Sequence, residues 1–225
     1  DLNHYPSMRH TLKYGLHYTY HIYTPSTVDV ESGDTEFNID TPSALRAHEA
    51  AAYVQDDFDV TDQLRVNFGV RLSYFAHVGS FREYLLDGQG NSVGIREYGA
   101  NEKVKDYAGL EPRMSLRYKI DAYSSFKASF NRNLQYVHLA SFSSVGLPTD
   151  VWIPSGKNVK PQVALQYAAG YFRDLKERKY EASVELYYKD MLNQIEYAEG
   201  ANPQDGGNTN YDALLVYGKG WSYGA

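Results

Sequence analysis

The stretch "LRVNFGVRLSY" runs from Leu64 to Tyr74 and alternates apolar side chains with polar or small ones. The apolar set takes every even position: Leu64, Val66, Phe68, Val70, Leu72 and Tyr74. Because successive side chains of a β-strand point to opposite faces, this alternation predicts a strand with one apolar and one polar face. The fold therefore depends on whether the apolar face packs into a protein core or contacts lipid.

Similar alternation recurs along the chain and predicts about eight strands in an all-β, antiparallel, up-and-down sheet. The predicted strands are Thr11–Tyr23, Arg46–Val60, Leu64–Val78, Ala108–Ile120, Ser125–Val137, Gln162–Asp174, Lys179–Tyr197 and a last one from Tyr211. They are longer than the usual strand of about 5–6 residues. A tilted strand that crosses a bilayer needs about 9–11 residues. Pro112 lacks a backbone donor, so we expect a local irregularity in the fourth strand.

The connections between these strands alternate between long and short. The long ones are 24–45, 79–107, 138–161 and 199–210, and the short ones are 61–63, 121–124 and 175–179. In an up-and-down sheet this order places every long loop at one end. Outer-membrane barrels have this layout, so the sequence predicts a transmembrane β-barrel segment.

In that arrangement the polar rows face the barrel lumen. The residues predicted to face the lumen are Arg71, Glu111, Arg113, Arg117, Lys127, Asn131, Glu181 and Glu185. Tyrosines near strand ends, which resemble the aromatic girdles of membrane barrels, are Tyr23, Tyr74, Tyr118, Tyr136, Tyr171 and Tyr188. Alternation by itself also fits a soluble barrel with the apolar rows inside.

Composition excludes several other classes of protein. The net charge is −6 and no basic block occurs, which argues against nucleic acid as a partner. The chain has no cysteine, hence no disulfide framework or thiolate chemistry. No apolar run of about 18 residues predicts a transmembrane helix. The opening "DLNHYPSMRH" does not resemble a signal peptide.

Enzymatic and metal-binding motifs are weak. His17 and His21 share a face but lie roughly 13 Å apart along a strand, too far to chelate one metal ion. "DDFD" at 56–59 is interpreted as a solvated strand end, and "DGGNTN" at 205–210 as a surface loop. "GQGNSVG" at 88–94 lacks the Lys-Ser/Thr of a phosphate loop. We therefore predict no enzyme activity, no metal and no cofactor.

Several segments in order carry a family resemblance. "AAYVQDDFDVTDQLRVNFGVRLSYF" resembles the strand–periplasmic turn–strand signature of TonB-dependent outer-membrane receptors. "LEPRMSLRYKI" with "SFKASFNRNLQY" is similar to the next hairpin of that family. "LPTDVWIPSGKNVKPQVALQYAAGYFRDL", "YEASVELYYKDMLNQIEY" and "GKGWSYGA" resemble the strands that follow. The resemblance covers most of the chain from about residue 46 and is closest to Bacteroidetes-like receptors.

The resemblance implies nutrient uptake across the outer membrane of a Gram-negative bacterium, energised by TonB. Such receptors combine a plug, a TonB-binding box and a barrel of about 22 strands. Residues 1–225 show no plug-like segment and no such box, so we expect an internal fragment of the barrel domain. Its expected partners are outer-membrane lipid, the plug of the same parent chain, the TonB complex and a nutrient ligand. Open strand edges could also pair with another chain.

The nutrient stays open among siderophore, vitamin, oligosaccharide and peptide. Ligand-binding candidates are the aromatic and guanidinium side chains of the long loops, because such groups dominate binding hot spots. They are Arg82, Tyr84, Arg96, Tyr98, Phe142 and Trp152. Two alternatives remain at this point: a self-contained eight-stranded outer-membrane barrel with a structural or adhesion role, and a soluble ligand-binding β-barrel.

Overall fold

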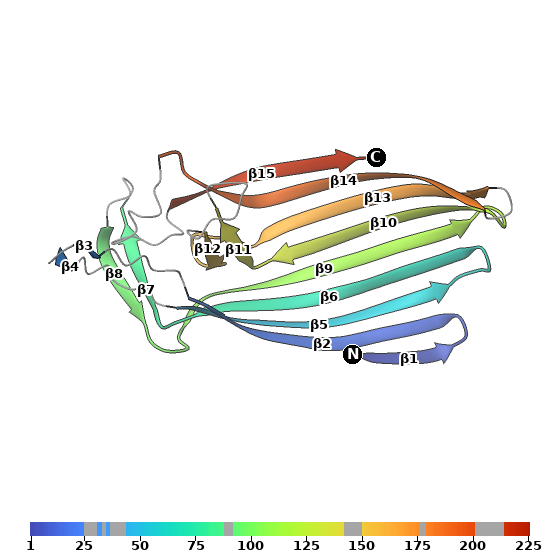
Figure 1. Ribbon diagram of the computed structural model, residues 1–225. Coiled ribbons are helices and arrows are strands. Elements are labelled where there is room, and N and C mark those ends of the chain that lie inside the picture. The colour runs from blue at the N-terminus through green and yellow to red at the C-terminus, as the bar shows by residue number, and fades with distance from the viewer. Residues whose placement is uncertain are drawn as a thin grey trace.

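One antiparallel sheet of nine strands organises the protein. The computed structural model describes residues 1–24, 31–32, 35–36, 44–87, 92–141, 150–175, 179–200 and 214–225. The sheet runs in the order β1 (Leu2–Ser7), β2 (His10–Tyr23), β5 (Leu45–Asp59), β6 (Leu64–Val78), β9 (Lys103–Lys119), β10 (Ser124–Gln135), β13 (Gln162–Leu175), β14 (Tyr180–Tyr197) and β15 (Leu215–Gly224). Sequential neighbours pair, and within the described ranges β1 and β15 stay at open edges (Figure 1).

Three small hairpins lie together at one end of this sheet (Figure 1). They are β3 (Glu31–Ser32) with β4 (Thr35–Glu36), β7 (Phe81–Leu86) with β8 (Ser92–Tyr98), and β11 (Val137–Ala140) with β12 (Val151–Pro154). The opposite end carries the short connections. The predicted sorting of long and short loops is thus confirmed. We call the two ends the loop end and the turn end.

All eight predicted strands are present, and the structure adds strands that the alternation does not reveal. The strand β1 escapes prediction because its sequence, "LNHYPS", has no period of two and contains Pro6. A proline is tolerated there because the register with β2 is interrupted between His4 and Ser7. The three hairpins lie inside segments that the sequence predicts as loops, where short strands carry too few residues for a periodic signal.

The strand register gives the sheet two chemically distinct faces. In β6, Phe68, Val70 and Leu72 share the apolar face, while Asn67 and Arg71 share the polar face. On the apolar face Leu16 is 82% exposed and Leu186 is 56% exposed. Within the described residues nothing covers these side chains, as expected for a surface that meets lipid.

The irregularity expected at Pro112 occurs on one side of β9. Pro112 pairs with Val70 without a break in register. The pairing with β10, however, stops at Arg113 and Asn131, the position next to the proline. Beyond it the guanidinium of Arg132 donates to the carbonyl of Leu110. Side-chain contacts thus bridge the strands where the backbone ladder ends.

A small core covers the polar face at the loop end. Ala47, Phe75 and Tyr136 form a buried cluster, and the rings of Phe75 and Tyr136 stack 5.0 Å apart. Tyr136 is only 3% exposed, so its assignment to the girdle was wrong. It follows the last residue of β10, where the strand alternation no longer applies. Tyr23 also fails as a girdle residue, because it shares the polar face with His21 and stacks on Trp152.

Candidate functional site

The residues predicted to face the lumen share the polar face of the sheet. Directly paired residues of antiparallel strands point to the same side. Arg71 pairs with Glu111, Arg113 with Asn131, and Arg117 with Lys127. Lys127 in turn pairs with Gly170, and Gly170 pairs with Glu185. Glu181 lies four residues before Glu185 on β14 and therefore points to the same face.

Arg71 joins two carboxylates on this face. Its Nη2 lies 3.7 Å from Glu49 Oε1, and its Nε lies 3.4 Å from Glu111 Oε1. Glu49 also contacts His21, with 3.1 Å between Oε2 and Nε2. The Glu111 side chain is only 6% exposed. The group spans β2, β5, β6 and β9, so it fixes the relative positions of four strands.

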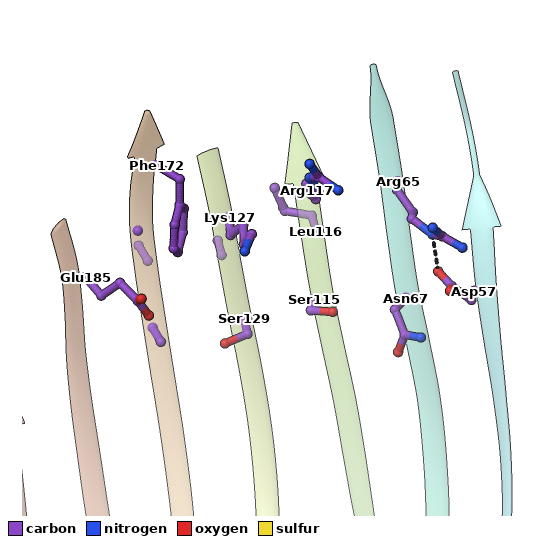
Figure 2. A pocket seen from close by; sticks show the side chains of 14 residues that line it. Asp57, Arg65, Asn67, Ser115, Leu116, Arg117, Lys127, Ser129, Phe172 and Glu185 are labelled. Carbon is purple, nitrogen blue, oxygen red and sulfur yellow. Dashed lines mark hydrogen bonds and ion pairs between the residues drawn. The ribbon is translucent and has the colours of Figure 1, made fainter. Parts of the chain in front are cut away.

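A hollow of about 510 Å³ opens on the polar face toward the turn end. Its lining includes Asn67, Ser115, Arg117, Lys127, Phe172 and Glu185, which lie on five consecutive strands of the sheet (Figure 2). Small residues make room for it, since Ala168 and Gly170 line its base. Charged and hydroxyl side chains are directed into the hollow, next to apolar surface from residues such as Leu116, Ala128 and Phe172.

At the loop end, Tyr98 connects two long loops. Its hydroxyl donates to Glu83 Oε2 at 2.9 Å and accepts from Lys157 Nζ at 2.7 Å. Lys157 also donates to Glu83 at 2.8 Å. These hydrogen bonds, first of all the one to Glu83, raise the pKa of Lys157, which therefore stays cationic. Tyr98 is 4% exposed, so in this conformation it braces the β7–β8 hairpin.

Replacing Lys157 with methionine is expected to loosen the β7–β8 hairpin. Glu83, which is buried, loses its cationic partner, and a hydrogen bond to a charged group contributes about 1.5–3 kcal/mol. Hydrogen exchange of the β8 amides should accelerate in the variant. Lys160, an exposed lysine of the same loop, offers the control Lys160→Met. Equal hydrogen exchange of the β8 amides in both variants would show that the β7–β8 hairpin does not need the contacts of Lys157.

His138 is buried in β11, in the same long loop as Lys157. It is 1% exposed, and its Nε2 lies 2.9 Å from Ser155 Oγ. Its Nδ1 has no hydrogen-bond partner among the described residues. Burial lowers the pKa of His138 from 6.5 to about 4. The imidazole is therefore neutral at pH 7 while the hairpin is packed.

Packing of the β11–β12 hairpin is expected to weaken in acid. The pKa of His138 is lower in the folded protein than in the unfolded chain. The neutral imidazole therefore stabilises the packed hairpin fully above pH 6.5, and this stabilisation declines as the pH falls toward 4. The shift corresponds to on the order of 3 kcal/mol. Hydrogen exchange of the β11 amides, corrected for the intrinsic pH dependence, should accelerate below pH 5. A His138→Gln variant should lose most of this dependence, and an unchanged profile would contradict the assignment.

Three of the other loop candidates, Arg82, Tyr84 and Arg96, lie in the β7–β8 hairpin, where the side chains of Arg82 and Tyr84 hydrogen-bond. Arg82 is exposed and forms an ion pair with Glu97 at 3.2 Å, and Arg96 lies over the Tyr98 ring at 4.9 Å. Tyr84 is partly buried in the same hairpin. Trp152 is 48% exposed and stacks against Tyr23, 6.2 Å between ring centroids. Phe142 lies outside the described residues. Ligand binding by these side chains stays a prediction.

The described residues of the weak sequence motifs make other contacts than metal ligation. In "DDFD", Asp57 pairs with Arg65 and Asp56 contacts His10. His21 contacts Glu49 and Tyr23 instead of His17. Across the part of the chain that the structure describes, no three His, Asp or Glu side chains gather as metal ligands would. "DGGNTN" and part of "GQGNSVG" lie outside the described residues.

Sequence reasoning missed the partners of several polar residues. Glu49, Glu83 and Lys157 were not singled out, and His21 was considered only as a metal ligand together with His17, although each holds a charged or hydrogen-bonded contact. Glu49 and His21 could have been found, because both occupy polar-face positions of predicted strands. Glu83 and Lys157 lie in different loops, 74 residues apart, and no pattern links them.

The family profile described as "TonB dependent receptor-like, beta-barrel" matches residues 1–225. The chain belongs to the TonB-dependent receptor family. Its members are receptors and transporters of the Gram-negative outer membrane and not enzymes, so the alternative of a soluble ligand-binding barrel was wrong. A comparison with curated proteins found no match.

Solved structures support the fold. The FrpB iron transporter from Neisseria meningitidis, F3-3 variant, superposes with a TM-score of 0.60 at 13% identity, over 98% of this chain and 30% of that chain. The apoprotein form of its F5-1 variant gives 0.58 at 15% identity, over 98% and 31%. This TonB-dependent receptor sheet thus spans about a third of these chains. Among the described residues, no helix is long and apolar enough to span a membrane.

Proposed function

We propose that residues 1–225 form part of the barrel wall of a receptor that takes up a nutrient across the outer membrane with energy from TonB. The match of the family profile along the whole chain carries this proposal. The nutrient is a siderophore, a vitamin, an oligosaccharide or a peptide. The low identity to the iron transporters does not select among these.

The two faces of the sheet would have different roles in this receptor. The apolar face would contact lipid, while the polar face, with Arg71, Glu111 and the hollow, would line the lumen. The nutrient would first meet the loop end, where Arg82, Arg96 and Trp152 present exposed side chains. Tyr84 and Phe142 belong to the same loops and complete this proposed ligand surface.

The parent protein would supply the plug, the TonB-binding segment and the remaining strands of the barrel. We place the plug and the TonB-binding segment outside residues 1–225, in the same polypeptide, with the plug inside the completed barrel. The sheet edges β1 and β15 would then pair with further strands of the parent barrel rather than with a second molecule. A self-contained small barrel has less support, because β1 and β15 do not pair within the described residues.

Gene deletion tests the function. The source bacterium is grown with each nutrient class in turn as the limiting source, and strains lacking this receptor or lacking TonB are compared with the parent strain. We expect both deletions to abolish use of the same nutrient. The cloned receptor gene should restore use of that nutrient only when TonB is present. Normal uptake of that nutrient without TonB would contradict energisation, and no defect in the receptor deletion would contradict nutrient uptake.

A further inference from the structure

Three cations lie side by side on the polar face near the turn end. Arg65 on β6 pairs directly with Arg117 on β9, and Arg117 pairs directly with Lys127 on β10. We call these three residues the basic row. Like charges directly opposite each other on neighbouring strands destabilise a sheet. The row therefore needs negative charge close by.

Among the described residues, carboxylates neutralise only one end of the basic row. Arg65 Nε lies 2.8 Å from Asp57 Oδ1 and 3.5 Å from Asp59 Oδ1, so both carboxylates serve the same guanidinium. Neither Arg117 nor Lys127 forms an ion pair with any described residue. Glu185 lines the same hollow, but Gly170 separates it from Lys127 in the row across the sheet. Within the described part of the chain, two adjacent positive charges are thus left without a counter-charge.

The surroundings of these two cations are shaped for a small group rich in hydrogen-bond acceptors. The hollow lies in front of them, and the hydroxyls of Ser115 and Ser129 project from the strands around it (Figure 2). A Cβ on Gly170 would lie 3.0 Å from both Glu185 Cγ and Phe172 Cε2, so only glycine keeps this part of the hollow open without displacing them. The Lys127 ammonium rests 3.9 Å from the centre of the Phe172 ring, which holds it at the rim.

We propose that this hollow binds an oxyanion, a carboxylate or phosphate group, between Arg117 and Lys127. The guanidinium and the ammonium would form charge-assisted hydrogen bonds to it, which are about twice as strong as neutral ones. Serine hydroxyls can donate further hydrogen bonds. The oxyanion is either a free solute or a side-chain carboxylate of the polypeptide that occupies the lumen, and the chemistry of recognition is the same for both. The proposed oxyanion site does not depend on whether TonB energises uptake.

Lysine reactivity in the full-length receptor tests the proposal. The purified protein in detergent is treated with an amine-acylating reagent, and the rate at Lys127 is followed by peptide mass spectrometry, with and without inorganic phosphate. Sodium chloride at equal ionic strength controls for screening. Lys189, which lies on the same face opposite Gln166 and Ser222, is the internal control lysine. A parallel sample receives a carbodiimide, which couples amines to carboxylates in contact.

Two results would support the site and would identify its occupant. For a free oxyanion, phosphate at ~10 times its Kd should slow acylation of Lys127 about tenfold by mass action, leave Lys189 unchanged, and lose this effect in Arg117→Gln. For a polypeptide carboxylate, Lys127 should acylate slowly without phosphate, become reactive in Arg117→Gln, and couple to an Asp or Glu outside residues 1–225. Acylation of Lys127 as fast as Lys189 and insensitive to phosphate, or coupling of Lys127 only to Glu185, would overturn the proposal.

Discussion

Replacing Arg71 with methionine is expected to lower the free energy of unfolding of the receptor by about 3–5 kcal/mol. Arg71 is the cation that Glu49 and Glu111 share, and the Glu111 side chain is 6% exposed. Removing this cation leaves the buried Glu111 carboxylate without its compensating charge, which costs more than the pair itself contributes. Unfolding in urea, with the variant and the native protein in the same detergent or lipid, measures the difference.

A double variant separates lost charge compensation from lost packing. Arg71→Met combined with Glu111→Gln removes the stranded carboxylate, while Glu49 keeps its contact with His21. The double variant should therefore be more stable than Arg71→Met alone. If the double variant were less stable than the single one, packing of the Arg71 side chain would explain the loss, and the charge argument would fail.

Replacing Leu186 with arginine is expected to destabilise the membrane-inserted barrel by about 2–4 kcal/mol, the cost of a guanidinium on the lipid face near the bilayer midplane. Leu186 lies on the apolar face of β14, pairs with Ala169 and is 56% exposed in the sheet. The substitution removes little packing within the protein, so its cost reports on the surrounding lipid. Unfolding from lipid vesicles and the yield of assembled barrel in outer membranes both measure it.

Ser183 provides the matched control for this substitution. It lies on the polar face of the same strand, between Glu181 and Glu185, and pairs with Phe172. Ser183→Arg introduces the same side chain next to two carboxylates and away from lipid. It should change stability by much less than Leu186→Arg. Equal losses in both variants would contradict the assignment of the two faces.

Alternation along the chain predicts most of this fold, because long strands repeat a period of two often enough to be recognised. Loop lengths then place the long connections at one end. The alternation also predicts that Arg71, Glu111, Arg117 and Lys127 share one face, and the register of the paired strands agrees. Here the local pattern and the tertiary arrangement coincide, since each strand pairs with its neighbour in the chain or across one connecting hairpin.

Contacts between loops could not be predicted, because they depend on how separate connections pack. The sequence offers Tyr98 as a ligand-binding candidate, and no pattern in it reveals that the side chain is buried between Glu83 and Lys157. Tyr136 has an even number, like the apolar residues of β10, and the alternation therefore predicts it on the lipid face. It follows the end of β10, however, and packs on Phe75. The alternation predicts the face of a side chain only within a strand. The prediction is least certain at the last residues of the strand.

Spin labels along Leu64–Tyr74 test the central claim most directly. Residues 1–225 contain no cysteine, so single cysteines can be introduced there one at a time, with any cysteine elsewhere in the parent protein changed to serine. In lipid vesicles, labels at positions 66, 68, 70 and 72 should be accessible to oxygen, and labels at 65 and 67 to a water-soluble nickel complex. A period of two with this phase is the result that we predict. The opposite phase, or no alternation, would contradict a barrel wall with its apolar face in lipid and its polar face in the lumen.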